Sequence, residues 1–174
     1  MRSARTFSLL AAATLLSGWL AGATLERSAV VMRVWQTLGL KPWVHFDHGA
    51  VLGTGFTLEG FVGVAAAALI FAAAASAIFD RESERETPIS LIIAGVASVL
   101  GLMFTAKAVS HLQLLAASPA APDLRPLFYQ YLIWGVDFRA AASVIAFVAV
   151  VWALLSLRVS PAPGKSGTAE TPAE

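Results

Sequence analysis

The sequence predicts an all-α, polytopic membrane protein, built as a four-transmembrane-helix bundle with a disordered C-terminal tail. Of its 174 residues, 57% are hydrophobic and 13% are charged, whereas a soluble domain has about 25% charged residues. The charges lie between four uncharged blocks of about 18 to 20 residues, and at 1.5 Å per residue each block reaches across the roughly 30 Å of a bilayer. Backbone groups in lipid must pair internally, and the alternation typical of barrel strands is missing, so we expect helices.

The predicted membrane domain covers residues 1–159. Its four spans lie at about 6–25, 57–79, 88–115 and 138–157. The first span begins after Arg2 and Arg5 and ends near Ala21-Gly22-Ala23, a pattern that also fits a cleaved signal peptide. We favour a retained helix, because the apolar run is long enough to cross the membrane and three further spans follow it.

The segment that joins the first two spans, from Glu26 to Glu59, is the longest polar-containing stretch of the chain. Within it, Val30, Val34 and Leu38 follow a helical repeat, so this piece either extends the first helix or lies along the membrane interface. The second and third spans are joined by a charged segment at 80–87 that is short enough only for a tight hairpin.

The start of the fourth span depends on Arg139. A helix that began near Phe128 would place this arginine near the bilayer centre, at a cost of about 2.5 to 3.5 kcal/mol. We therefore expect the span to begin at about 138, with Asp137 and Arg139 at the interface. Residues 160–174 are rich in Pro, Ala, Thr, Gly and Glu and have no apolar periodicity, which predicts the disordered tail.

The orientation in the membrane has a weak signal in the sequence. With four spans, the 12 Lys and Arg residues divide equally between the two faces. The basic start of the first helix favours cytoplasmic termini in a multi-pass protein of the cell (inner) membrane.

Composition and motifs exclude several kinds of partner. The net charge is +1 and the basic residues form no stripe, so nucleic acid is not an expected partner. The glycines from Gly49 to Gly55 follow no strand, and Gly164-Lys165-Ser166 lacks the upstream glycine of a phosphate loop, so no nucleotide is expected.

The lipid bilayer is the expected partner. Small residues spaced like Gly18 and Gly22 would suit either packing within this bundle, which we favour, or partner membrane helices.

A metal site is one hypothesis for the first loop. The four-span topology places the first and third loops on the same face of the membrane, and hence all 3 histidines as well. His45, Asp47 and His48 could ligate zinc, iron or copper, with His111 or Glu59 completing the set. The simpler interpretation, which we favour, is an interfacial loop whose histidines contact lipid headgroups.

Three further residues are candidates for catalysis, namely Glu59, His111 and Arg139. An acid at the start of a helix is stabilised by the helix dipole, but an acid at the membrane can also carry a proton or bind a cation. Arg139 either extends to the headgroups or meets Glu59 across helices. No histidine lies deep in another span opposite His111, so haem inside the bundle is not expected and no cofactor is identified.

Three segments resemble the anthrone-oxygenase-like family of small four-span membrane proteins, most of which are uncharacterised in bacteria. They are Gly18 to Gly22, Thr105 to Gln113, and Trp134 followed by Arg139. The resemblance spans most of residues 5–157, and it departs from the family at Val109 to Gln113, where members have a stretch containing Asn and Pro. It implies a four-helix architecture and, in some relatives, oxygen-dependent oxidation of a polycyclic phenolic substrate, with no established cofactor.

The resulting functional hypothesis is an integral membrane protein of unassigned activity with a polar or metal-binding site at one membrane face and oxygenase-like or small-molecule chemistry. The alternatives are an accessory or assembly subunit and, third, a small-solute carrier. An enzyme site predicts that the histidines, Glu59 and Arg139 converge beside a cavity. A carrier predicts polar groups near the midplane, where the spans offer little beyond Thr14, Ser17, Ser98 and Ser143.

Overall fold

The structure, a computed structural model, describes residues 2–38, 56–79, 86–117 and 125–159. Every residue in these ranges is helical, and no strand occurs within them. The predicted all-α fold class is therefore confirmed. The histidines at 45 and 48 and the proposed metal ligand Asp47 lie outside the described residues.

The helices form four long rods. The first rod contains α1 (Arg2–Glu26), the π-helical segment η1 (Arg27–Val31) and α2 (Met32–Leu38). The second and third rods are single helices, α4 (Phe56–Phe79) and α5 (Glu86–Ala117). The fourth rod contains α6 (Arg125–Gln130), the π-helical segment η3 (Tyr131–Asp137) and α7 (Phe138–Val159). Each rod includes a stretch apolar and long enough to cross a membrane: Ala4–Thr37, Leu58–Phe79, Ile89–Leu115 and Arg125–Leu157.

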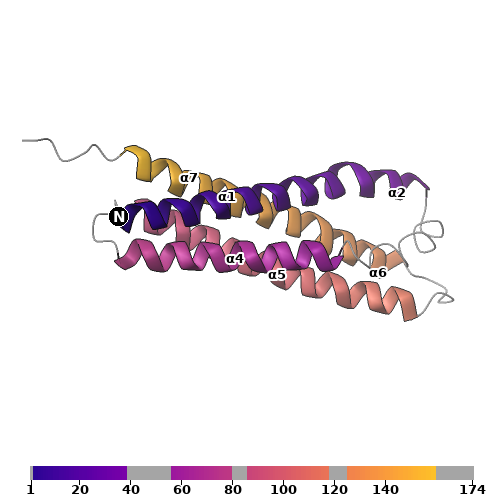
Figure 1. Cartoon of the computed structure of the whole chain (residues 1–174). Coiled ribbons are helices and arrows are strands. Elements are labelled where there is room, and N and C mark those ends of the chain that lie inside the picture. The colour runs from indigo at the N-terminus through magenta and orange to yellow at the C-terminus, as the bar shows by residue number, and fades with distance from the viewer. Residues whose placement is uncertain (1, 39–55, 80–85, 118–124, 160–174) are drawn as a thin grey trace, which may run out of the picture.

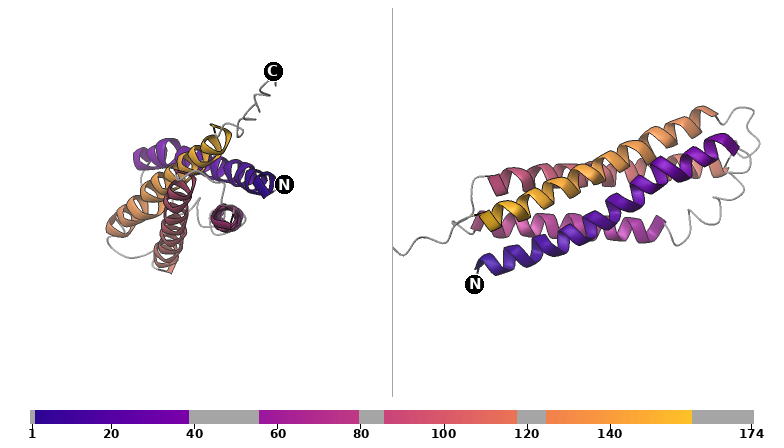
Figure 2. Two further views of the ribbon diagram at one scale, coloured as in Figure 1. Left: turned by 90° about the vertical axis from the view of Figure 1, so that its left-hand side faces the viewer. Right: turned by 90° about the horizontal axis from the view of Figure 1, so that it is seen from above.

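The rods pack side by side as an antiparallel bundle (Figures 1 and 2). Helix α1 packs against α4 and α7, and α5 packs against the same two helices. Helices α4 and α7 are thus diagonal partners across the bundle axis. The N-terminal end of α1, the C-terminal end of α4 and the C-terminal end of α7 lie at one end of the bundle (Figure 1). We call this the termini end, and the other the loop end.

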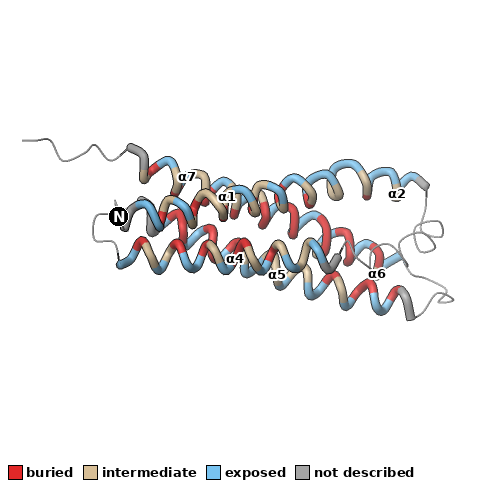
Figure 3. Tube along the Cα trace, in the orientation of Figure 1, coloured by how far each residue is buried: buried red, intermediate tan, exposed pale blue. Residues whose placement is uncertain are grey.

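The bundle is apolar outside as well as inside, as expected of helices whose solvent is lipid. Large apolar side chains such as Leu15, Phe61, Ile92 and Val148 are exposed on its surface, and buried residues form stripes that face the other rods (Figure 3). The half of the bundle nearest the termini is closed by a cluster of small and branched residues. Its buried members are Leu10, Ala13, Ile70, Ala73, Ala77, Leu91, Ala94, Ala149, Val150 and Ala153, here called the apolar plug.

At the loop end the described part of α4 begins at Phe56, while the other three rods continue further (Figure 1). A second apolar cluster packs these extensions together. Its buried members are Met32, Ala108, Leu112, Leu115, Phe128, Tyr131, Leu132 and Val136. Residues 30–38 therefore extend the first helix, which was one of the two sequence interpretations, because Met32 and Trp35 pack inward on this cluster.

The two π-helical segments contact each other at the loop end. Ser28 Oγ in η1 donates a hydrogen bond to Asp137 Oδ1 in η3, at 2.6 Å. On its other side η3 lies very close to α5, since a Cβ atom placed on Gly135 would be 2.5 Å from the Cβ of Ala108. π-Helical turns are rare and are frequent at functional sites. Here they lead directly into the region of Arg139.

The fourth rod is helical from Arg125, so its helix extends beyond the expected start of the fourth span at about 138. That expectation rested on the cost of an isolated charge in lipid. In the structure the charge of Arg139 is not isolated, because Arg139 is paired with Glu59 from the second rod. Where the membrane-spanning part of this helix begins stays a prediction from the sequence.

Candidate functional site

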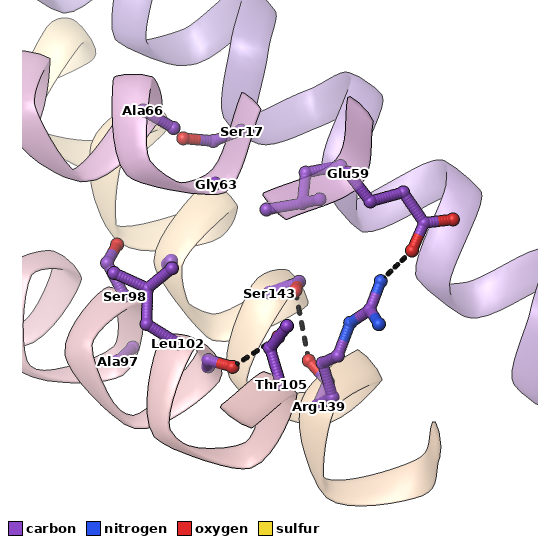
Figure 4. A pocket seen from close by; sticks show the side chains of 13 residues that line it. Ser17, Glu59, Gly63, Ala66, Ala97, Ser98, Leu102, Thr105, Arg139 and Ser143 are labelled. Atoms are coloured by element: carbon purple, nitrogen blue, oxygen red, sulfur yellow. Dashed lines mark hydrogen bonds and ion pairs between the residues drawn. The ribbon is translucent and has the colours of Figure 1, made fainter. Parts of the chain in front are cut away.

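An ion pair crosses the bundle axis at the loop end of the membrane-spanning region. Arg139 Nη2 donates a hydrogen bond to Glu59 Oε2, and the two side chains are 5% and 14% exposed. Glu59 lies in the first turn of α4 and Arg139 follows Phe138 at the start of α7, so the pair joins the two diagonal helices (Figure 4). Of the two interpretations for Arg139, the structure shows the contact with Glu59.

Further charged groups lie beside this pair. Asp137 accepts the hydrogen bond from Ser28, next to which Arg27 has a buried Nη1 atom. Lys107 Nζ lies 3.9 Å from the centre of the Trp134 ring, a cation–π contact. Charges from all four rods at one level are expected where hydrocarbon meets the headgroups. We call this level the charged layer.

A cavity lies next to the ion pair on the bundle axis, and all four long helices contribute to its wall. We call it the axial cavity. Its lining residues are Ser17 and Leu20 from α1, Glu59, Gly63 and Ala66 from α4, Ala97, Ser98, Gly101, Leu102 and Thr105 from α5, and Arg139, Ser143 and Ala146 from α7. The space open to the centres of water molecules is about 30 Å³. This is enough for about two water molecules or for a group of similar size.

The axial cavity extends from the charged layer into the bundle and ends there. Its wall runs along α4 from Glu59 to Ala66 and along α7 from Arg139 to Ala146, which is about 10 Å at 1.5 Å per residue. Beyond this depth lies the apolar plug, in which Ile70 and Val150 are fully buried. The cavity therefore reaches the middle of the bundle from the loop end without crossing to the termini end.

The hydroxyl groups around the axial cavity differ in what they can still bind. Thr105 Oγ1 donates to the Gly101 carbonyl at 2.8 Å, and Ser143 Oγ donates to the Arg139 carbonyl at 2.9 Å. Because these two hydroxyls donate their hydrogens within their own helices, toward the cavity they can only accept hydrogen bonds through their oxygen lone pairs. Ser17 is 3% exposed, and its Oγ has no hydrogen-bond partner in the structure. Ser17 can therefore both donate and accept inside the cavity.

We expect the Ser17→Ala variant to be as stable as the wild type or up to about 1 kcal/mol more stable, because it removes a buried hydroxyl that has no protein partner. The matched control is Ser143→Ala, which removes a hydroxyl that makes a hydrogen bond. Thermal unfolding of the purified protein in detergent measures both. A large loss of stability for Ser17→Ala would show that its hydroxyl makes a contact within the folded chain.

His111 does not line the axial cavity. Its Nδ1 lies 2.8 Å from the Lys107 carbonyl oxygen and its Nε2 lies 3.2 Å from Gln130 Oε1, with the residue 7% exposed. Both ring nitrogens thus contact oxygen atoms, and the ring ties α5 to α6. Of the three candidate catalytic residues, Glu59 and Arg139 come together and His111 is placed elsewhere.

The metal hypothesis concerned His45, Asp47 and His48, all outside the described ranges. Within the four described ranges, no three His, Asp or Glu residues gather as a ligand set. The metal site therefore stays a prediction from the sequence.

Sequence reasoning noted Ser17, Ser98 and Ser143 as rare polar residues in the spans, and it did not predict that all three share one cavity. Thr105 was noted only as part of the family resemblance. The position of each residue along its helix could have predicted this cavity. Once the helices are aligned antiparallel, these residues and Glu59 fall within about 10 Å of each other along the bundle axis.

Comparison with protein-family models, with curated proteins and with solved structures finds no match for this chain. The resemblance to the anthrone-oxygenase-like family therefore stays a prediction. Function has to be argued from the site itself.

Proposed function

We propose that this integral membrane protein binds a small molecule in the axial cavity, which it admits from one face of the membrane. The observation that supports this most is the convergence of polar side chains from all four helices on one cavity beside a buried ion pair. Polar groups within a membrane bundle are costly, so a cluster of them is a candidate functional site by default. Pockets of this kind commonly form between the helices of bundles.

The positions of the small residues favour a binding protein over an accessory subunit. A Cβ atom on Gly18 would lie 3.0 Å from the Phe147 ring, and one on Gly63 would lie 3.4 Å from Leu102. Gly18 and Gly63 thus lie against side chains of the chain's own bundle, whereas an added Cβ on Gly22, the other glycine of the sequence pattern, would meet nothing within 4 Å. An accessory subunit would instead be expected to present its small residues to a partner helix.

The placement of the hydroxyls makes a carrier a stronger candidate than the sequence suggested. A carrier needs polar groups near the midplane of the membrane. Three hydroxyl groups of the spans, those of Ser17, Ser98 and Ser143, line the axial cavity. The apolar plug closes the other half of the bundle. A carrier with this structure would exchange its ligand with the loop end, because Glu59 and Arg139 of the charged layer line the cavity on that side. If the termini are cytoplasmic in the inner membrane, as we propose, the loop end faces away from the cytoplasm.

The second candidate is an oxygenase-like enzyme. It is favoured by the position of Thr105 and Arg139, two residues of the family resemblance, on the wall of the same cavity. Arg139 would then position a phenolic oxygen. An anthrone and dioxygen would give the anthraquinone and water. Oxygen uptake by the purified protein with an anthrone tests this candidate, with the stability-restored double variant Glu59→Leu/Arg139→Met as the control.

Access to the axial cavity can be measured with single cysteines, because the chain contains none of its own. We expect Thr105→Cys, near the ion pair, to react with a membrane-impermeant methanethiosulfonate reagent added at one face of sealed vesicles and not at the other. The control is Ala94→Cys in the apolar plug, which is fully buried on the same helix and should not react. Equal reaction of Thr105→Cys from both faces, or none, would contradict a one-sided cavity.

A further inference from the structure

The axial cavity is balanced in charge. Among its lining residues, Glu59 and Arg139 are the charged ones, and they are paired with each other. A ligand with a net charge would leave water for this largely buried site without a free counter-charge, or would have to separate the existing pair. Either step is unfavourable in a site of low dielectric constant. The charge balance therefore favours a ligand without net charge.

The wall of the axial cavity offers hydrogen bonds of a defined kind. Ser17 Oγ is buried and has no partner, so it can donate and accept. Ser143 Oγ and Thr105 Oγ1 donate to carbonyls of their own helices, so toward the cavity they can only accept. A hydroxyl or amide group can satisfy such a set because it both donates and accepts. A group that only accepts could pair with the Ser17 hydroxyl but not with the oxygens of Ser143 and Thr105.

We propose that the ligand of the axial cavity is uncharged overall and has a hydroxyl or amide end that binds at Ser17, between α1 and α5. This inference rests on the proposed function and names the class of molecule for the same site. The space of about 30 Å³ limits the buried end to a group about the size of two waters. Figure 4 shows Ser17 and Ser98 on the side of the cavity away from the ion pair.

The charge of the ligand can be tested at Ser98→Cys with three methanethiosulfonate reagents that each carry a substituted ethyl group: the uncharged hydroxyethyl compound, the anionic sulfonatoethyl compound and the cationic trimethylammonioethyl compound. With rates normalised to those of a free thiol, we expect the uncharged reagent to react at least about tenfold faster than either charged reagent, which corresponds to about 1.4 kcal/mol. The exchanged variant Glu59→Arg/Arg139→Glu keeps the balance of charge and should keep this order.

The hydrogen-bonding end can be tested with acetamide and acetate as competitors of the uncharged reagent. Acetamide at about four times its dissociation constant should slow the labelling of Ser98→Cys about fivefold, by simple occupancy. Acetate should give no protection. Adding Ser17→Ala should remove the protection by acetamide, measured relative to the unprotected rate of the same double variant.

The outcomes separate this inference from the proposed function. If a charged reagent labels Ser98→Cys as fast as the uncharged one, or if acetamide protects equally with and without Ser17, the inference is overturned while one-sided access at Thr105→Cys still supports a binding cavity. If neither Thr105→Cys nor Ser98→Cys reacts with any reagent, the proposed function fails and the inference fails with it.

Discussion

Replacing Arg139 by methionine is expected to lower the free energy of unfolding by about 3 to 5 kcal/mol. The substitution keeps a long side chain but leaves the Glu59 carboxylate, 14% exposed, without its partner, and breaking one side of a buried ion pair typically costs this much. The effect should be seen as a shift in the unfolding transition of the purified protein in mixed micelles. An exposed arginine, Arg33, which bonds Gln36 at 3.2 Å, provides the control, and Arg33→Met should change stability by less than about 0.5 kcal/mol.

A double variant distinguishes the effect of an unpaired buried charge from the effect of altered side-chain packing. Glu59→Leu alone leaves the guanidinium unpaired and should also be destabilising, but Glu59→Leu/Arg139→Met replaces the pair by apolar side chains. Such replacements are often neutral or stabilising, so the double variant should regain most of the lost stability. The two single effects should therefore fail to add, with a coupling energy of about 2 kcal/mol or more. Additive losses would mean that the two side chains stabilise the bundle independently.

The same double variant should lose ligand binding in the axial cavity even though its stability is restored. The pair supplies the cavity's charged groups, and ionic groups within a membrane are costly and usually functional. A stable but inactive double variant would thus separate the role of the pair in ligand binding from its role in folding.

The fold class could be predicted from the sequence because it depends on a property that each segment has by itself. Blocks such as 60–79 are long and uncharged, and this decides whether a helix can cross a bilayer regardless of its neighbours. The ends of the helices were harder to predict. The helix that contains Arg139 already begins at Arg125, and the charge of Arg139 is paired with a residue on another rod, Glu59.

The site was predictable in part. Glu59, His111 and Arg139 stood out because polar residues are rare in such spans, and the contact between Glu59 and Arg139 was one of two interpretations. Which residues face the bundle axis could not be predicted, since the apolar surface toward lipid resembles the apolar core. In α5, for example, exposed Ile92 and buried Leu91 are equally hydrophobic neighbours. The rotation of each helix is set by packing, and packing placed Ser17, Ser98 and Ser143 around one cavity while it turned His111 toward Gln130.

The close approach of η3 and α5 leads to the second large effect, for Gly135→Ala. The added Cβ would lie 2.5 Å from the Cβ of Ala108 and 3.2 Å from its Cα, and neither atom can rotate away. The two rods would have to separate, and overpacking of this kind costs about 1 to 3 kcal/mol or more. We expect about 3 kcal/mol, measured by the same unfolding experiment, because the contact is with atoms fixed to the backbone.

The matched control is Gly22→Ala, also in a helix, where an added Cβ would meet nothing within 4 Å. This variant should be unchanged or stabilised by up to about 1 kcal/mol, since alanine is the better helix former. Gly135→Ala/Ala108→Gly moves the methyl group from one rod to the other and should restore most of the stability lost in Gly135→Ala. If the reciprocal change restores nothing, the glycine is needed for the π-helical backbone of η3 itself. Because η3 leads into Arg139, labelling of Thr105→Cys in these variants would then report how far the axial cavity depends on that backbone.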